Sequence, residues 1–120
     1  MQYLMMIWVN EKGWASATPE QQQKQMAAYT AFREAIGKAG VLKGSNRLQD
    51  GPTASTIRTV DGKTQVLDGP YADTKEQLGG YFLIDVPDQD AAISWAARCP
   101  GAQYGVVEVR PVWPMPGALS

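Results

Sequence analysis

The chain has 120 residues, of which 44% are hydrophobic and 19% are charged, a composition typical of a folded globular protein. Its formal net charge is −1 and its charges form no long run of one sign, which argues against a nucleic-acid-binding surface. It has one cysteine, Cys99, and no histidine, so an internal disulfide, an imidazole base and a Cys/His zinc site are excluded.

The length predicts one domain that spans residues 1–120. The opening apolar run is short, has no basic region before it and is followed at once by Asn10, Glu11 and Lys12, unlike a secretory signal. No segment approaches the roughly 20 apolar residues of a membrane-spanning helix. With a single cysteine as well, we expect a cytoplasmic protein that does not contact a membrane.

The first 40 residues predict a strand and then a helix. Tyr3–Val9 is continuously apolar, which is typical of a central strand covered on both faces. Gly13–Thr18 is predicted as a connection, and Thr18 followed by Pro19 predicts a capped helix that runs until Gly40. The predicted buried stripe of this helix consists of Met26, Tyr29, Phe32 and Ile36.

A second strand and a hairpin follow. Val41–Leu48 predicts a weaker strand. Ser55–Val60 and Lys63–Leu67 flank Asp61-Gly62, a dipeptide suited to a two-residue hairpin turn. The cross-strand pairs that this turn predicts are Val60 with Lys63, Arg58 with Gln65, and Ile57 with Val66. Alternation therefore separates Arg58 from the apolar pair.

The last third of the chain predicts a strand, a helix and a strand. Tyr81–Val86 is an apolar strand, and Asp88 caps a helix over Gln89–Arg98. The residues of this helix predicted to cover the sheet are Ile93, Ala96 and Ala97. Residues 106–110 predict the last strand. The three prolines of the tail 111–116 prevent further strand pairing, so we expect this apolar tail to pack on another surface, such as that of a partner subunit.

The predicted order is strand, helix, strand, hairpin, strand, helix, strand. Without the hairpin this order is βαββαβ, the split βαβ pattern of ferredoxin-like α+β folds. Both helices would cover one face of an antiparallel sheet, while the other face still carries apolar side chains. Because that face must also be buried, we predict a homodimer that packs sheet against sheet.

Residues 68–80 combine chain breakers with ionisable groups directly before a predicted strand, and loops that hold charges beside a rigid strand often carry function. Asp68 and Glu76 are candidate acid–base groups, and Arg58 and Lys75 are candidates to bind a small anionic ligand. The residues predicted to shape the loop are Gly69, Pro70, Gly79 and Gly80, and those predicted to line a cleft are Tyr3, Tyr71 and Tyr81.

These residues also have structural alternatives. Asp68 can accept hydrogen bonds from backbone amides of its own turn, Lys75 and Glu76 can form a solvated charged pair, and the tyrosines can fill the core or its rim. The glycine spacing does not match a phosphate-binding loop, because Gly79 and Gly80 precede a strand and not a helix. We expect no cofactor and no metal.

The run from Asp68 to Tyr81, Asp-Gly-Pro-Tyr-Ala-Asp-Thr-Lys-Glu-Gln-Leu-Gly-Gly-Tyr, resembles the signature of the DGPF branch of the YCII-related family, with Tyr71 where the signature usually has Phe. Residues 3–7, 91–95 and 107–111 resemble the same family. The resemblance implies a dimeric α/β barrel of ferredoxin-like subunits, with a cleft between sheet and loops. Some relatives carry a His–Asp pair proposed as catalytic, which this chain cannot inherit because it has no histidine.

Three functions are compatible with these features. The first is an enzyme of the lyase or isomerase kind that acts on a small carboxylate-bearing compound and uses a carboxylate for proton transfer. The second is a binding or regulatory dimer without turnover, which the missing histidine and the family's lack of assigned reactions support. The resemblance would link such a dimer to sigma-factor stress signalling, because genes of the DGPF type often neighbour genes for extracytoplasmic-function sigma factors. The third is an accessory module that contacts another protein through its tail and its sheet. The sequence leaves open whether the protein is an enzyme.

Overall fold

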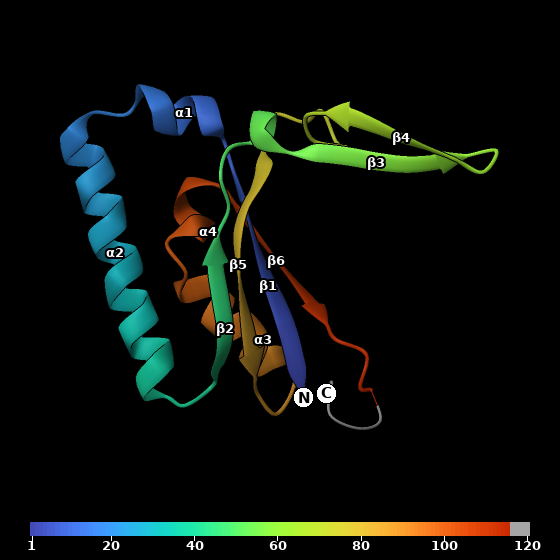
Figure 1. Ribbon diagram of the computed structural model, residues 1–120. Coiled ribbons are helices and arrows are strands. Elements are labelled where there is room, and N and C mark those ends of the chain that lie inside the picture. The colour runs from blue at the N-terminus through green and yellow to red at the C-terminus, as the bar shows by residue number, and fades with distance from the viewer. Residues whose placement is uncertain (116–120) are drawn as a thin grey trace.

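The computed structural model describes residues 1–115, which form a four-stranded antiparallel sheet, helices that cover it and a separate two-stranded hairpin (Figure 1). The sheet has the order β2-β5-β1-β6, with β1 (Gln2–Val9), β2 (Leu42–Arg47), β5 (Gln77–Asp85) and β6 (Val106–Pro111). The remaining elements are α1 (Glu11–Ser16), α2 (Pro19–Lys38), the 3-10 helix η1 (Gly51–Thr53), β3 (Ser55–Val60), β4 (Lys63–Asp68), α3 (Gln89–Arg98) and α4 (Gly101–Tyr104). The predicted ferredoxin-like α+β subunit with an inserted hairpin is confirmed.

The core lies between the sheet and the helices α2 and α3. Its buried members are Tyr3, Met5, Ile7, Phe32, Ile36, Phe82, Ile84, Val86, Ala92, Ala96 and Cys99. The rings of Phe32 and Phe82 meet edge to face with their centroids 5.3 Å apart, a favourable aromatic geometry. Since α2 and α3 both contribute to one cluster with alternate residues of β1 and β5, the two helices cover the same face of the sheet. None of the helices within residues 1–115 is long and apolar enough to cross a membrane.

The start of α2 has the predicted form, whereas α1 was not predicted. The Thr18 hydroxyl accepts a hydrogen bond from Gln21 N at 3.1 Å, and the Gln21 side chain accepts one from Thr18 N at 2.9 Å, which makes a capping box. The segment predicted as a connection is largely helical, because the Asn10 side chain accepts from Gly13 N at 3.1 Å and caps α1.

The predicted helix faces are partly wrong. Phe32 and Ile36 are buried, but Met26 is 54% exposed, because the first half of α2 faces a pocket and not packed side chains. On α3, Ala92 is buried while Ile93 is 51% exposed, and Ala97 is also exposed. Ala92 and Ala96 are four residues apart and lie on one face of the helix, where their small side chains contact the sheet.

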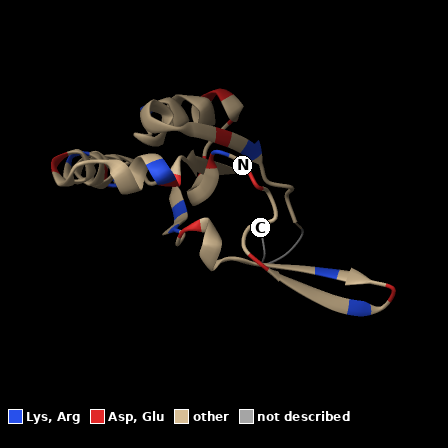
Figure 2. Ribbon diagram, turned by 90° about the horizontal axis from the view of Figure 1, so that it is seen from above, with Lys and Arg blue, Asp and Glu red and all other residues tan. Residues whose placement is uncertain are grey.

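The hairpin β3–β4, which we call the arm (residues 55–68), projects away from the helices (Figures 1 and 2). Its predicted pairs are confirmed, and its turn has the positive φ angles of 50° at Asp61 and 76° at Gly62 that such a turn requires. Within the described residues the arm pairs with no other strand. Ile57, Val66 and Leu67 are 65%, 62% and 64% exposed. Because an isolated two-stranded hairpin is marginally stable in water, these side chains need a covering surface.

The face of the sheet opposite the helices also carries apolar side chains. We call this the open face and define it by Leu4, Met6, Trp8, Tyr81 and Leu83, which the strand registers place together and which are each only partly buried. The tail after β6 stays close to β1, since Val112 N donates to Gln2 O at 2.9 Å. Trp113 of this tail is 86% exposed within one subunit, and the last residue of the predicted tail, Pro116, lies outside the described residues.

The N-terminal ammonium joins the edge of the fold. Met1 N donates to Asp85 Oδ1 at 2.9 Å and to Val86 O at 3.1 Å. The hydrogen bond from Met1 N to the Asp85 carboxylate, followed by the positive charge of the ammonium, holds the pKa of Asp85 below its ordinary value of 3.8. Asp85, predicted as the polar end of a strand, is exposed and serves as the anchor of the first residue.

Asp85→Asn is expected to flatten the acid limb of the stability curve. The pKa of Asp85 is lower in the folded chain than in the unfolded chain, so the pair stabilises the protein above about pH 4 and this stabilisation is lost as the pH falls through the folded value. Thermal melts at acidic and neutral pH measure the effect, with Asp73→Asn as the control because it removes an exposed carboxylate without an ion pair within residues 1–115. Parallel curves for wild type and Asp85→Asn would contradict the assignment.

Candidate functional site

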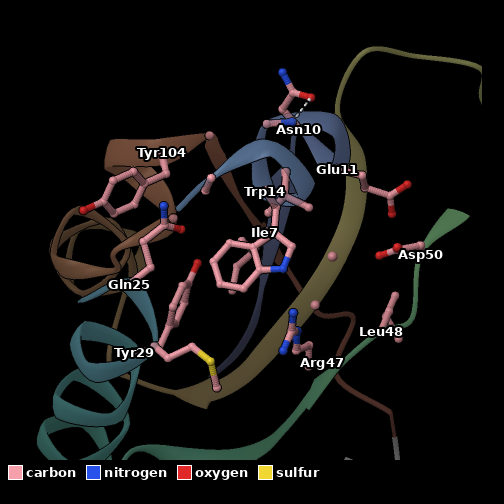
Figure 3. Close-up of a pocket in the computed structure, with 18 of the residues that line it drawn as sticks. Ile7, Asn10, Glu11, Trp14, Gln25, Tyr29, Arg47, Leu48, Asp50 and Tyr104 are labelled. Atoms are coloured by element: carbon pink, nitrogen blue, oxygen red, sulfur yellow. Dashed lines mark hydrogen bonds between the residues drawn. The ribbon is translucent and has the colours of Figure 1, made fainter. Parts of the chain in front are cut away.

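A pocket of about 820 Å³ lies between the helices and the sheet (Figure 3). Residues of α1, α2 and α4 form its walls, and residues of β1, β2 and β5 form its floor. Its volume falls in the range of roughly 300–1,000 Å³ that small-molecule sites have. The aromatic residues that line it are Trp14, Tyr29, Tyr81, Phe82 and Tyr104, and the charged ones are Glu11, Lys24, Arg33, Arg47 and Asp50.

Arg47 is the last residue of β2 and lies over the indole of Trp14. Its Cζ is 5.5 Å from the centroid of the Trp14 ring, within the range of a cation–π interaction. Neither of the ion pairs formed within residues 1–115 involves Arg47. The planar guanidinium is therefore available to an anion in the pocket, and it can hold a carboxylate through two parallel hydrogen bonds.

The helix α1 is fixed at both ends, which positions Trp14 over the pocket. Gln22 Nε2 of α2 donates to Trp14 O at 2.8 Å. On the other side, the Glu11 carboxylate accepts from Gly51 N with both oxygens, at 2.8 and 3.1 Å. The charge of Glu11 is thus engaged by the backbone of the loop that leads to the arm. Helix α1 links α2 to this loop and forms one side of the pocket mouth.

Tyr29 of α2 lines the pocket on the wall opposite Arg47, where it presents its phenol. Burial, followed by the neighbouring Cys99 thiol, raises the pKa of Tyr29 far above its ordinary value of 10.0, while the positive charge of Arg47 opposes this shift. Burial likewise raises the pKa of the Cys99 thiol. Tyr29 is therefore an uncharged hydroxyl near neutral pH, able to donate one hydrogen bond and to accept others.

The room for the Tyr29 hydroxyl is created by a glycine at the start of α4. A Cβ on Gly101 would lie 2.7 Å from the Tyr29 hydroxyl and 2.8 Å from Ile7 Cγ2, distances shorter than van der Waals contact. Gly101→Ala is therefore expected to lower the free energy of unfolding by about 1–3 kcal/mol, the usual cost of overpacking a buried site.

The control for this substitution is Gly37→Ala, because a Cβ on Gly37 of α2 meets nothing within 4 Å. That change is expected to stabilise the protein by roughly 0.5–1 kcal/mol, since alanine favours a helix more than glycine does. Urea denaturation of both variants measures the difference. Equal stability of Gly101→Ala and wild type would show that the Tyr29 side chain moves aside without lowering the free energy of unfolding.

The residues predicted for the site occupy several places. Gly79 and Gly80 line the pocket. Tyr81 follows them in the floor of the pocket, but strand alternation puts its side chain on the open face, beside Met6. Glu76 is not among the lining residues, but its Oε2 lies 3.6 Å from the position that a Cβ on Gly105 would take, and Gly105 lines the pocket. Tyr3 is a core residue, 4% exposed.

The other predicted residues lie on or beside the arm. Arg58 and Asp68 belong to β3 and β4, and Lys75 lies in the exposed loop before β5. Arg58 Cζ is 5.9 Å from the centroid of the Tyr71 ring, which is 78% exposed. No ion pair within residues 1–115 joins the predicted cluster of Arg58, Asp68, Lys75 and Glu76. The roles of these residues in binding and catalysis stay predictions.

The loop between β4 and β5, residues 69–76, is held in shape by the Gln77 side chain and by Gly69. Gln77 Nε2 donates to Ala72 O at 3.0 Å and to Thr74 O at 2.9 Å, so one side chain holds the loop together. Gly69 has a φ of 100°, a conformation that favours glycine. Gly79 and Gly80, predicted in the loop, are part of β5, and a Cβ on Gly80 would lie 2.8 Å from Asn46 O of the neighbouring strand.

Trp14, Arg47 and Tyr29 were not predicted as site residues from the sequence. Trp14 lay in the segment predicted as a connection, and Tyr29 was assigned to the buried stripe of a helix. Arg47 is the last residue of an amphipathic strand, and nothing in its immediate sequence distinguishes it from a solvated arginine. Within the described residues, no group of three or more cysteine, aspartate and glutamate side chains is placed to hold a metal ion.

Comparisons with known proteins identify the family of this chain and a solved structure of similar fold. The family model of the YCII-related domain matches residues 1–116. An uncharacterized protein of Rhizobium meliloti (strain 1021) is 34% identical over 114 residues, which cover 93% of this chain and 92% of that protein.

A solved structure has a similar fold. It is the 5-chloro-2-hydroxyhydroquinone dehydrochlorinase of Burkholderia phenoliruptrix AC1100 in complex with 2,5-dihydroxybenzoquinone. The alignment covers 94% of each chain with a TM-score of 0.54 at 13% sequence identity. At this identity the similarity concerns the fold alone, and it agrees with the ferredoxin-like α+β architecture described above.

Proposed function

Because this chain belongs to the YCII-related family, we propose that it is a homodimer that binds a small organic anion in the pocket beside α1 and α2. The observation that carries this proposal is Arg47, a pocket-lining guanidinium without an ion pair within residues 1–115. The cytoplasmic location expected from the sequence belongs to the same proposal.

The chemistry of the pocket fits a carboxylate on a small, flat compound. A guanidinium matches the two oxygens of a carboxylate, and the Trp14 ring beside it offers an apolar surface for the body of the ligand. Lys24 and Arg33 of α2 also line the pocket, so the lining has three basic side chains and two carboxylates, those of Glu11 and Asp50. The Glu11 carboxylate is already engaged with Gly51 N. The dehydrochlorinase of similar fold binds a flat, oxygen-rich ring, which supports a ligand of this size.

The test is titration calorimetry with benzoate, acetate and benzamide. Benzoate should bind and raise the melting temperature, while benzamide, its uncharged counterpart of nearly equal shape, should bind much more weakly. Acetate should bind more weakly than benzoate because it lacks the ring that covers Trp14. Equal affinities for benzoate and benzamide, or no binding by any of the acids, would end the proposal.

The homodimer in this proposal is supported by two uncovered apolar surfaces on one subunit. The open face exposes part of Leu4, Met6 and Leu83, and the arm projects on the side away from the helices. A twofold arrangement of sheet against sheet would cover both open faces at once, because each copy supplies the same patch.

Turnover of the lyase kind is a second candidate function, supported by the fold that this chain shares with a dehydrochlorinase. Removal of hydrogen chloride needs a base that takes the proton while chloride leaves. Of the predicted catalytic carboxylates, Asp68 lies on the arm, whereas Glu76 is near Gly105, a residue that lines the pocket. Glu76 is therefore the carboxylate that we propose for proton transfer.

Glu76→Gln is expected to lower chloride release from 5-chloro-2-hydroxyhydroquinone by roughly 100-fold or more, the usual contribution of a general base. Benzoate affinity should stay unchanged, because the amide keeps the shape of the side chain. Glu34→Gln, on an exposed position of α2, is the matched control. Absence of chloride release by the wild type would remove the enzymatic candidate and leave the binding proposal intact.

A further inference from the structure

The wall of the pocket formed by Tyr29 differs in chemistry from the wall that carries Arg47. The Tyr29 hydroxyl lies against Gly101 and Ile7, as the positions around a Cβ on Gly101 show. Cys99, its other neighbour, is buried, with 2% exposure. These neighbours are apolar or weakly polar, and the polar side chain drawn beside Tyr29 in the pocket is the uncharged amide of Gln25 (Figure 3).

Tyr29, Trp14 and Arg47 nonetheless belong to one cavity. All three line the same pocket (Figure 3). The guanidinium of Arg47 lies 5.5 Å from the centre of the Trp14 ring. Its positive charge also acts on Tyr29, where it opposes the rise in pKa that burial causes. A ligand held at Arg47 that covers the Trp14 ring therefore extends toward Tyr29. At that end it meets a hydroxyl that stays protonated near neutral pH.

We propose that Tyr29 is a specificity-determining residue that hydrogen-bonds an uncharged oxygen of the ligand, so that the pocket selects aromatic monocarboxylates with a ring hydroxyl or ring carbonyl. This inference rests on the proposed function, because Arg47 must first hold the carboxylate. A hydroxyl or carbonyl oxygen suits Tyr29, which can both donate and accept a hydrogen bond. A ligand with a second carboxylate at this end would bind more weakly, because the apolar neighbours Ile7 and Gly101 cannot replace the water that the carboxylate loses.

The test compares benzoate, 3-hydroxybenzoate, 4-hydroxybenzoate and isophthalate by titration calorimetry. At least one hydroxybenzoate should bind roughly three- to tenfold more tightly than benzoate, the gain expected of one hydrogen bond in a half-buried site. Isophthalate should bind more weakly than benzoate. In Tyr29→Phe the gain from the hydroxyl should vanish while the affinity for benzoate stays within about twofold, which also shows that the variant is folded.

Tyr104→Phe is the matched control, since Tyr104 also lines the pocket but is 48% exposed. This variant should keep the gain from the hydroxyl. The inference is overturned if neither hydroxybenzoate exceeds benzoate, if isophthalate binds best, or if the gain survives in Tyr29→Phe and vanishes in Tyr104→Phe. These outcomes leave benzoate binding in place, whereas failure of the proposed function abolishes the binding of every acid in the series.

Discussion

Arg47→Gln is expected to weaken benzoate binding by roughly 10- to 100-fold, because a hydrogen bond to a charged group contributes about 1.5–3 kcal/mol. Glutamine keeps a polar side chain, but it is shorter than arginine and lacks the positive charge and the fork of N–H donors. The affinity of the wild type should fall as salt is added, and that of the variant should depend less on salt. Titration calorimetry at two ionic strengths measures both effects.

Two further variants separate a specific site from a general effect of charge. Lys43→Gln removes one positive charge from the same strand at an exposed position outside the pocket. It is expected to leave benzoate affinity within about twofold, since exposed charges at a distance are screened by solvent and salt. Arg47→Lys should bind with intermediate affinity, because it keeps the charge but loses the bidentate geometry. Equal losses in Lys43→Gln and Arg47→Gln would show that no specific anion site exists at Arg47.

The order of the elements could be predicted because each one has a local signal. Thr18 and Gln21 form the capping box that starts α2, and Asp61-Gly62 supplies the positive φ angles that set the arm register. These signals act over a few residues and need no tertiary information. The helix α1 was missed although Asn10 caps it, because a six-residue helix that contains Gly13 has little intrinsic propensity and depends on its contacts with α2 and η1.

The site could not be predicted in the same way, because its residues meet only through tertiary structure. Trp14 and Arg47 are far apart in sequence and come together because α1 and the end of β2 both border the pocket. Tyr29 shows the same helical spacing as Phe32 and Ile36 and also packs against the core, but it lines the pocket as well, whereas those two residues are buried. A stripe of apolar residues therefore predicts which side of a helix faces inward, but not whether that side meets a core or a pocket.

Met6→Glu is expected to dissociate the proposed homodimer and raise its dissociation constant roughly 100-fold, since an unpaired buried carboxylate costs about 3 kcal/mol or more. Met6 lies at the middle of β1 on the open face, beside Tyr81 of β5 and Glu108 of β6 in the strand registers. The introduced carboxylate adds to the existing charge of Glu108, and both would lose water in a dimer that packs sheet against sheet. Light scattering after gel filtration, over a range of protein concentrations, measures the mass.

Ile93→Glu is the control, because Ile93 is 51% exposed on α3, in the helical layer and away from the open face. It adds the same charge and is expected to leave the mass of the dimer unchanged.

A variant with Ile57→Asp and Val66→Asp tests whether the interface lies on the arm, since these residues are the exposed apolar pair of the arm. Dissociation by Met6→Glu alone places the interface on the open face, whereas dissociation by the arm variant alone moves the interface to the arm. A wild-type chain that has the mass of one 13.1 kDa subunit at every concentration would refute the dimer itself.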